Sequence, residues 1–158
     1  MEISFQVTRI PAYSVNRGKR LIKAPKLFWT DTGLAAHLAD MHAEEALVDS
    51  REWGFWLENW VGLHLQVYAS LKIPRITVSH WRTSDGHEVD FVLEAGKKLL
   101  PVEVKSTSRP SGRDLRGMDL FLDAYANAPF GIVVCPCQRP RALSARILAL
   151  PITWLLLY

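Results

Sequence analysis

The segment EVDFVLEAGKKLLPVEVK, residues 88–105, decides the fold of this chain. It holds two runs of alternating apolar and polar residues on either side of Ala-Gly-Lys-Lys, a pattern that predicts a β-hairpin. The side chains expected on its apolar face are those of Val89, Phe91, Leu93, Leu100, Val102 and Val104. We expect that face to lie in the core, and the opposite face, with Asp90 and Glu103, to be polar.

The hydrophobic pattern also selects the register of this hairpin. A loop with an even number of residues sets Phe91 opposite Val102. The same register sets Asp90 opposite Glu103. A slip of one residue would set Asp90 against an apolar side chain, so the even loop is favoured. Two carboxylates then face each other with their Cβ atoms about 4.5–5.5 Å apart.

Two facing carboxylates repel each other by about 1 kcal/mol in water and about 3 kcal/mol at an effective dielectric constant of 20. Protonation of one acid, full solvation, the nearby ammonium of Lys105 or a divalent cation would each offset that repulsion. The acidic residues and Lys105 also have an explanation without a functional site, because exposed antiparallel strands commonly carry Glu and Lys. In that case Glu88 and Lys105 form a cross-strand pair on a solvated surface.

The remaining patterns predict a mixed α/β fold, with a central mixed sheet that contains an antiparallel meander and is flanked by helices. Apolar residues spaced three and four apart predict a helix from Trp53 to Leu71, which Pro74 ends. The other expected elements are strands at 26–30, 76–82, 130–135 and 152–157 and helices at about 32–40 and 112–128.

Glu58 lies at the edge of the apolar stripe of the long predicted helix, with Gly54 and Gly62 one turn away on either side. Two glycines lower helix stability by about 2 kcal/mol, so they indicate a close approach of another backbone or of a ligand. Glu58 is therefore a third candidate acid for the site.

Residues 1–31 differ from the rest of the chain and are interpreted as a basic connector. Within ten positions they hold the basic side chains of Arg17, Lys19, Arg20, Lys23 and Lys26. Such a segment is either a solvated linker or an arm that contacts phosphates or a partner. Residues 32–158 are then expected to form one domain with its core at about 53–135.

Composition narrows the class of protein. The 158 residues are 49% hydrophobic and 22% charged, which excludes a disordered chain, and a net charge of +3 leans only slightly toward polyanions. Cys135 and Cys137 flank one proline, and the five histidines lack ligand spacing, so no zinc site is expected. No leader and no apolar span of about 20 residues is evident, so we expect a cytoplasmic protein without a membrane anchor.

Four segments together resemble a known family. They are KRLIKAPKLFWTDTGLA at 19–35, WRT at 81–83, EVDFVLE at 88–94 and PVEVKS at 101–106. Acids on a helix and a strand, followed by Glu-Val-Lys on the next strand, look like the signature of the PD-(D/E)XK nuclease superfamily. The wider pattern resembles the uncharacterised C-terminal domain of a prokaryotic family of AAA-type ATPases.

The resemblance implies a restriction-endonuclease-like core and metal-dependent hydrolysis of DNA phosphodiester bonds. Asp90, Glu103 and the main-chain carbonyl of Val104 would hold Mg²⁺ or Mn²⁺, with Glu58 assisting. Lys105 would orient the attacking water or stabilise developing negative charge. It also implies that the chain is the C-terminal part of a longer protein with an N-terminal ATPase domain.

The chain itself has no phosphate-binding loop, because neither Gly18-Lys19-Arg20 nor Gly96-Lys97-Lys98 has the required flanking residues, so we expect no ATP site. DNA is the expected partner, contacted by Arg109, Arg113, Arg116 and the basic residues of the connector, although a solvated helix face explains the arginines equally well. The alternative function is a catalytically silent module that binds nucleic acid or a partner, and a purely structural role is a third hypothesis.

Overall fold

The computed structural model describes residues 5–16, 18, 20, 23–41, 43, 47–48 and 50–156. The strands are β1 Val7–Ile10, β2 Lys26–Trp29, β3 Thr77–Arg82, β4 Glu88–Ala95, β5 Lys98–Val104, β6 Gly131–Cys135, β7 Arg141–Ala142 and β8 Ile147–Pro151. The helices are α2 Thr32–Leu38, α4 Trp53–Ser70 and α5 Arg116–Ala124, with short 3₁₀ helices η1 Gly112–Leu115 and η2 Ile152–Leu156.

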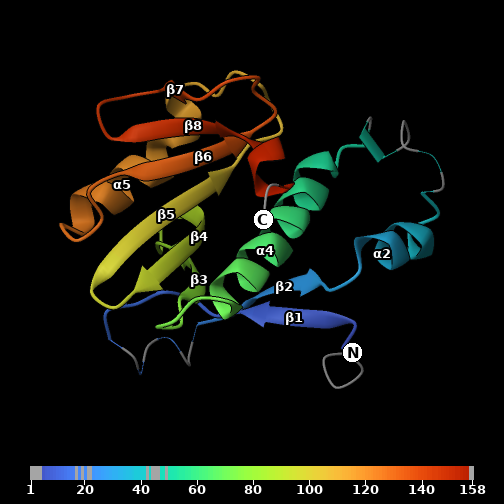
Figure 1. Ribbon diagram of the computed structural model, residues 1–158, viewed down its shortest axis with the longest axis horizontal. Helices are drawn as coiled ribbons and strands as arrows, with labels where there is room; N and C mark the ends of the chain where they lie inside the picture. Colours follow the sequence, from blue (N-terminus) through green and yellow to red (C-terminus); the bar gives the residue numbers. More distant parts are fainter. Residues whose placement is uncertain are drawn as a thin grey trace.

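Six strands form one mixed sheet in the order β3-β4-β5-β6-β8-β7 (Figure 1). β3, β4 and β5 form an antiparallel meander. β5, β6 and β8 run parallel, and η1 and α5 connect β5 to β6. β7 is the edge strand of the sheet and pairs antiparallel with β8. The predicted mixed α/β class is therefore confirmed.

The β4–β5 hairpin has the register that the hydrophobic pattern predicted. Phe91 pairs with Val102, and the pairing continues without a shift to Ala95 and Lys98 at the turn. Gly96 in this turn has a φ of 62°, in the left-handed region that glycine adopts without strain. The expected register of the two acidic strands is thus confirmed.

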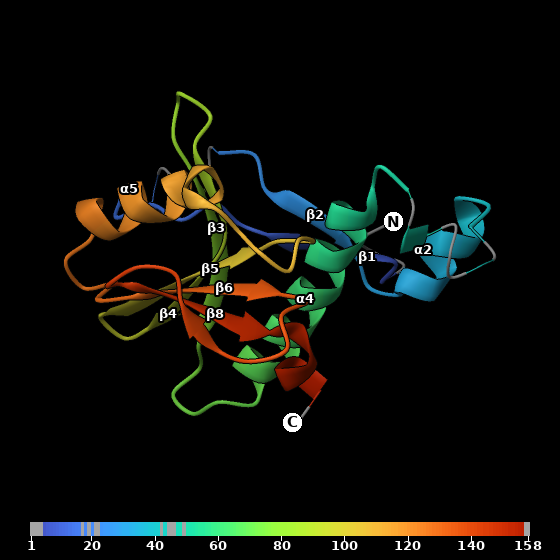
Figure 2. The same cartoon turned by 90° about the horizontal axis from the view of Figure 1, so that it is seen from above.

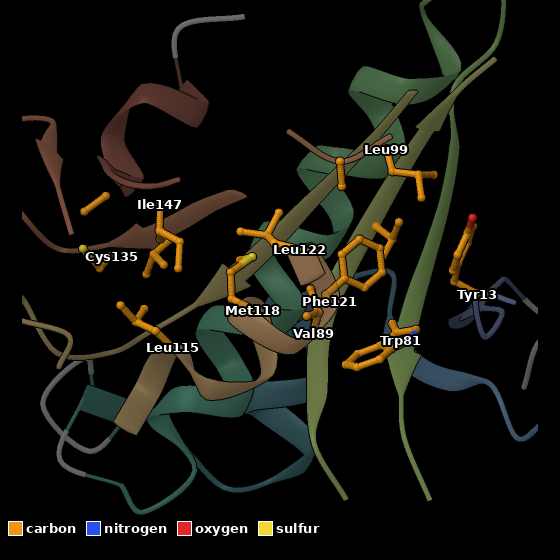
Figure 3. Close-up of a cluster of buried hydrophobic side chains, with 14 residues drawn as sticks. Tyr13, Trp81, Val89, Leu99, Leu115, Met118, Phe121, Leu122, Cys135 and Ile147 are labelled. Atoms are coloured by element: carbon orange, nitrogen blue, oxygen red, sulfur yellow. The ribbon is translucent and has the colours of Figure 1, made fainter. Parts of the chain in front are cut away.

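Helices cover both faces of the sheet (Figure 2). On one face, α4, the β1–β2 pair and η2 surround a buried cluster that includes Ile10, Phe28, Val61 and Phe91. On the other face, α5 packs over a second cluster, whose labelled side chains in Figure 3 are Tyr13, Trp81, Val89, Leu99, Leu115, Met118, Phe121, Leu122, Cys135 and Ile147. The sheet is therefore the middle layer of three.

The expectation that one face of the hairpin stays polar and solvated is wrong. Val92 is fully buried, and Asp90 and Glu103 are only 6% and 5% exposed. Val92 is covered by the crossover between β5 and β6, because Met118 and Phe121 of α5 lie in the same buried cluster. Asp90 instead contacts Lys26 of β2. Both acids are consequently buried.

The strict alternation expected along β4 is also broken. A register shift in the β3–β4 ladder lies between the pairs of Ser79 and Trp81. Val89 and Val92 therefore share the cluster under α5, although the pattern had placed Val89 on the face of Phe91. An irregularity of this kind re-aims nearby side chains.

The long helix α4 confirms the predicted element. Leu57, Val61 and Leu65 are buried, whereas Leu71, at the expected end of the helix, is 74% exposed. A Cβ on Gly62 would lie 3.0 Å from the ring of Phe91, so this glycine allows the helix to approach β4. A Cβ on Gly54 would meet nothing within 4 Å, so packing does not explain that glycine.

The C-terminal strand lies earlier than expected. Ile147–Pro151 forms β8 beside β6, whereas Ile152–Leu156 is a 3₁₀ helix rather than a strand. Ile152 and Leu155 pack against the cluster under α4, which explains why the chain turns off the sheet after Pro151.

The segment interpreted as a basic connector contributes to the core through β1 and β2. These strands pair antiparallel and bury Ile10 and Phe28 beneath α4. The Asp31 carboxylate caps the start of α2, because it accepts the amide hydrogen of Leu34 over 2.9 Å. No helix in the described part of the chain is long and apolar enough to cross a membrane.

Candidate functional site

Asp90 and Glu103 hold each other in place through the main chains of their strands. The amide of Asp90 donates a hydrogen bond to Oε2 of Glu103 over 3.3 Å. The amide of Val104 donates to Oδ2 of Asp90 over 2.9 Å. Each carboxylate is therefore fixed by a backbone donor of the opposite strand, just beyond the last regular Cα pair of the ladder.

Lys105 lies beside this pair of acids and contacts one of them. Its ammonium donates to Oε1 of Glu103 over 2.8 Å. The expected cross-strand pair with Glu88 is replaced in the described structure, where Glu88 approaches Arg82 at 4.0 Å. The Glu-Val-Lys sequence thus brings the ammonium of Lys105 into direct contact with the buried carboxylate of Glu103.

Glu58 reaches the same site from α4 through a lysine that the sequence patterns did not assign to it. The ammonium of Lys26 on β2 donates to Oε1 of Glu58 over 2.7 Å and to Oδ1 of Asp90 over 3.0 Å. Lys26 therefore joins the helix acid to the strand acid. Glu58, Asp90 and Glu103 form one acidic cluster with two lysines.

Asn59, the neighbour of Glu58, fixes β2 against α4. Its side-chain oxygen accepts the amide hydrogen of Trp29 over 2.7 Å, and its side-chain nitrogen donates to the carbonyl of Trp29 over 2.9 Å. Asn59 is fully buried, so it replaces a strand partner for the edge of β2. These hydrogen bonds hold β2 against α4, and Lys26 of β2 lies beside Glu58.

Burial gives the acids of the cluster unusual protonation behaviour. Desolvation, followed by the charge of Asp90, raises the pKa of Glu103 to about 8, although Lys105 opposes the shift. The same two causes raise the pKa of Glu58 to about 7, with Lys26 opposing. Burial and the charge of Asp90 therefore outweigh the two lysines and favour the protonated form of Glu103 near neutral pH.

The pKa values of both lysines are raised, which favours their charged form. Burial by itself would lower the pKa of Lys26, but the carboxylates of Asp90 and Glu58 outweigh it and raise that pKa above its ordinary value. The pKa of Lys105 is likewise raised, since Glu103 outweighs burial. Both ammonium groups stay charged near neutral pH.

The donor chemistry of the cluster fits a hard divalent cation. Among the residues that the structure describes, no group of three or more His, Cys, Asp and Glu side chains is arranged to hold a metal ion. Mg²⁺ does not require such a group, because it is commonly held by one or two carboxylates, water and substrate phosphates. Asp90 and Glu103 supply two carboxylates, and the raised pKa of Glu103 marks a position where added positive charge is favourable.

The three arginines expected to contact nucleic acid are exposed and lie after Lys105 in the chain. Arg109 is in the loop that leaves β5, Arg113 is in η1, and Arg116 begins α5. Asp114 of η1 is close enough to contribute to the pKa of Lys105, so η1 borders the acidic cluster.

Among the basic residues of the N-terminal segment that the structure describes, Lys26 reaches the cluster, whereas Arg20 and Lys23 contact other residues. Arg20 binds Glu94 over 2.8 Å, four residues along β4 and thus about 13 Å from Asp90. Lys23 donates to the carbonyl of Arg82 over 3.1 Å, at the same end of the meander as Asp90. Lys19 lies outside the described residues.

Lys26 is the site residue that the sequence reasoning missed, although the sequence holds a signal for it. In a strand, Lys26 lies on the same face as Phe28, which is the face that enters the core. A lysine on an inward face needs a buried negative partner. That signal indicates a counter-charge but does not identify Glu58 and Asp90 as the partners.

Comparison with known proteins adds a family and a set of relatives. Residues 53–155 match the family described as Domain of unknown function (DUF4143), and residues 1–45 match the Domain of unknown function (DUF8612). Uncharacterized proteins of Mycobacterium bovis and Mycobacterium tuberculosis are each 30% identical over 148 residues, which is 92% of this chain and 31% of theirs. The chain therefore spans about a third of the length of these relatives.

Among solved structures, the chain resembles part of an assembly of Thermococcus gammatolerans McrB AAA+ hexamers with bound McrC. The likeness has 12% identity and a TM-score of 0.44, and it covers 62% of this chain and 27% of that one. The family match, in contrast, includes α4, the β4–β5 hairpin and α5, which carry or border the acidic cluster. The chain belongs to the DUF4143 family, a family of unknown function.

Proposed function

We propose that this domain is a metal-dependent nuclease of the PD-(D/E)XK type that hydrolyses DNA phosphodiester bonds. The observation that carries the proposal is the mutual fixing of Asp90 and Glu103 by amides of opposite strands, with Lys105 on Glu103. Two buried acids held this rigidly are a costly arrangement for stability alone. A bound cation would offset the cost of burying the two acids side by side.

The residues of the site have separate roles in this proposal. Asp90 and Glu103, with the carbonyl of Val104, would hold Mg²⁺ or Mn²⁺, and Glu58 would assist from α4. When bound, the divalent ion would polarise the phosphoryl oxygen and supply a water of lowered pKa. Lys105, which contacts Glu103, would orient that water or stabilise the negative charge that grows on the phosphoryl group.

The reaction is a balanced hydrolysis. The oxygen of one water forms a bond to phosphorus, the bond from phosphorus to the leaving sugar oxygen breaks, and that oxygen takes up a proton. Arg109, Arg113 and Arg116 would contact neighbouring phosphates, which positions the backbone without reading sequence.

A nicking assay tests this function. The full chain with Mg²⁺ or Mn²⁺ is expected to convert supercoiled plasmid to the open-circular form, and Asp90→Asn and Glu103→Gln are each expected to reduce the rate at least about 100-fold. Asp85→Asn removes an equal charge from the exposed β3–β4 turn and serves as the matched control. Nicking that survives both site substitutions rejects the assignment.

A second function rests on Lys26. Its ammonium already forms ion pairs with Glu58 and Asp90, which favours a catalytically silent domain that binds nucleic acid or a partner. In that case DNA binding is expected without nicking, and Mn²⁺ has no reason to bind through Asp90. Plasmid retardation in a gel with no cleavage at any Mn²⁺ concentration supports this alternative.

We also infer an ATPase domain as the partner in the same polypeptide. The support is the resemblance of the 19–35, 81–83, 88–94 and 101–106 segments to the C-terminal domain of AAA-type ATPases, together with relatives about three times as long as the matched region. Sequencing of the native gene upstream of residue 1 tests it, and an intact reading frame without a nucleotide-binding domain contradicts it.

A further inference from the structure

We propose that Lys26 competes with the divalent ion for the acidic cluster, so that β2, which carries it, controls metal occupancy. The proposal rests on the metal-dependent function stated above and adds a control element to it. Its basis is the contact of one ammonium with Glu58 and Asp90, which lie on α4 and β4.

The oxygen atoms of Asp90 show why the two cations compete. Oδ2 accepts the amide hydrogen of Val104, so Oδ1 is the oxygen that has no main-chain donor and is the more accessible one for a metal ion. Lys26 donates to that same Oδ1 over 3.0 Å. A divalent ion that binds Asp90 therefore meets a positive charge at contact distance, and it must displace the ammonium or share the carboxylate with it.

Lys105 makes the corresponding contact on the other acid, because Oε2 of Glu103 accepts the amide hydrogen of Asp90 and Oε1 accepts from the Lys105 ammonium. Lys105 follows Glu103 by two residues in the chain, so it belongs to the proposed site itself. Lys26 differs because it comes from β2, outside the 53–155 region of the DUF4143 match and inside a second family match at residues 1–45. The competing charge thus belongs to a segment that is separable in sequence.

The docking of β2 decides where the ammonium of Lys26 lies. The two hydrogen bonds between Asn59 and Trp29 and the β1–β2 ladder hold the strand against α4. Any shift of β2 along α4 would withdraw Lys26 from Glu58 and Asp90 and raise the negative charge at the site. Metal binding and the docked position of β2 are therefore expected to oppose each other.

Isothermal titration of the metal-free full chain with Mn²⁺ tests the competition. Lys26→Gln keeps a hydrogen-bonding head group without charge and is expected to bind Mn²⁺ at least about tenfold more tightly than the wild type. Lys26→Arg retains the charge and is expected to match the wild type. Lys23→Gln removes an exposed charge that contacts only a carbonyl in the described structure, and it should change the affinity by less than about twofold.

The outcomes separate this inference from the proposed function. Wild-type binding that is lost in Asp90→Asn, with Lys26→Gln binding no more tightly, keeps the metal site and overturns the competition. No Mn²⁺ binding by either the wild type or Lys26→Gln overturns both. If Lys26→Gln is unfolded without metal, circular dichroism replaces calorimetry: refolding at lower Mn²⁺ than the wild type needs for binding supports the competition, and no refolding contradicts it.

Discussion

The amide of Asp90 donates to the Glu103 carboxylate over 3.3 Å, and both side chains are almost completely buried. The bond holds the two acids of adjacent strands in one geometry. This arrangement favours the protonated form of Glu103, because burial and the charge of Asp90 raise the pKa of Glu103 to about 8. The consequences of this arrangement for pH dependence, for metal binding and for stability can be measured separately.

Stability without metal should fall as the pH rises through the neutral range. The pKa of Glu103 rises from 4.5 to about 8 on folding, so between these values the folded chain holds a proton that the unfolded chain releases. The free energy of unfolding accordingly decreases across that window and levels off above it. Glu58, with a pKa of about 7, adds to the decrease over the lower part of the window.

Glu103→Gln should remove most of this pH dependence, because an amide has no proton to lose. Urea unfolding in EDTA at about pH 5 and about pH 9 is expected to show a smaller loss of stability in this variant than in the wild type. Asp85→Asn, in the exposed turn, should keep the wild-type difference. Equal losses in Glu103→Gln and the wild type would show that Glu103 is not the titrating group.

Gly117→Ala should destabilise the fold strongly. A Cβ at this position would lie 2.0 Å from the carbonyl oxygen of Glu88, so α5 would have to move away from β4. Overpacking of this kind typically lowers the free energy of unfolding by about 1–3 kcal/mol. Gly112→Ala, whose Cβ would meet nothing within 4 Å, is the control and should change urea unfolding little. Equal stability of the two variants would contradict the close α5–β4 approach.

Asn59→Ala should release β2 from α4. The substitution leaves the amide and carbonyl of Trp29 without their partner, which is expected to lower the free energy of unfolding by about 1–3 kcal/mol. Hydrogen exchange at the Trp29 amide should accelerate more than exchange in β4. Asn127→Ala removes a bond to Lys97 from an exposed amide and should have a smaller effect. Unchanged exchange at Trp29 would mean that Asn59 does not hold β2.

The exposed arginines of η1 and α5 should contribute to DNA binding through charge alone. Arg113→Gln together with Arg116→Gln is expected to weaken binding equally for unrelated sequences. The slope of log affinity against log salt should become shallower by up to about 0.9 for each phosphate that the protein no longer neutralises. Arg75, exposed before β3 and at the far end of the meander, provides the control substitution Arg75→Gln. An unchanged salt slope in the double variant would show that Arg113 and Arg116 do not contact DNA phosphates.

The local parts of the fold followed from the sequence. The alternation in residues 88–105 gave the correct register of Phe91 and Val102 because a slip of one residue would have reversed every side chain of the hairpin. The period of three and four residues gave α4 with its end near Leu71. Both signals lie within a single element or a single turn.

Burial of the hairpin did not follow from the sequence, because it depends on contacts between elements that are far apart in the chain. The close approach of Gly117 to Glu88 lays α5 over the sheet, and no spacing in either segment encodes that contact. The contact of Lys26 with Glu58 and Asp90 joins three elements that are far apart in sequence. Strand parity indicates only that Lys26 faces inward.

Mn²⁺ affinity measured by calorimetry tests the central claim, that Asp90 and Glu103 hold one divalent ion between them, most directly. The wild type is expected to bind one ion, and Asp90→Asn and Glu103→Gln should each weaken binding at least about tenfold, whereas Asp85→Asn should match the wild type. Equal Mn²⁺ affinity in all four proteins, or no binding by the wild type and by Lys26→Gln, would contradict the claim.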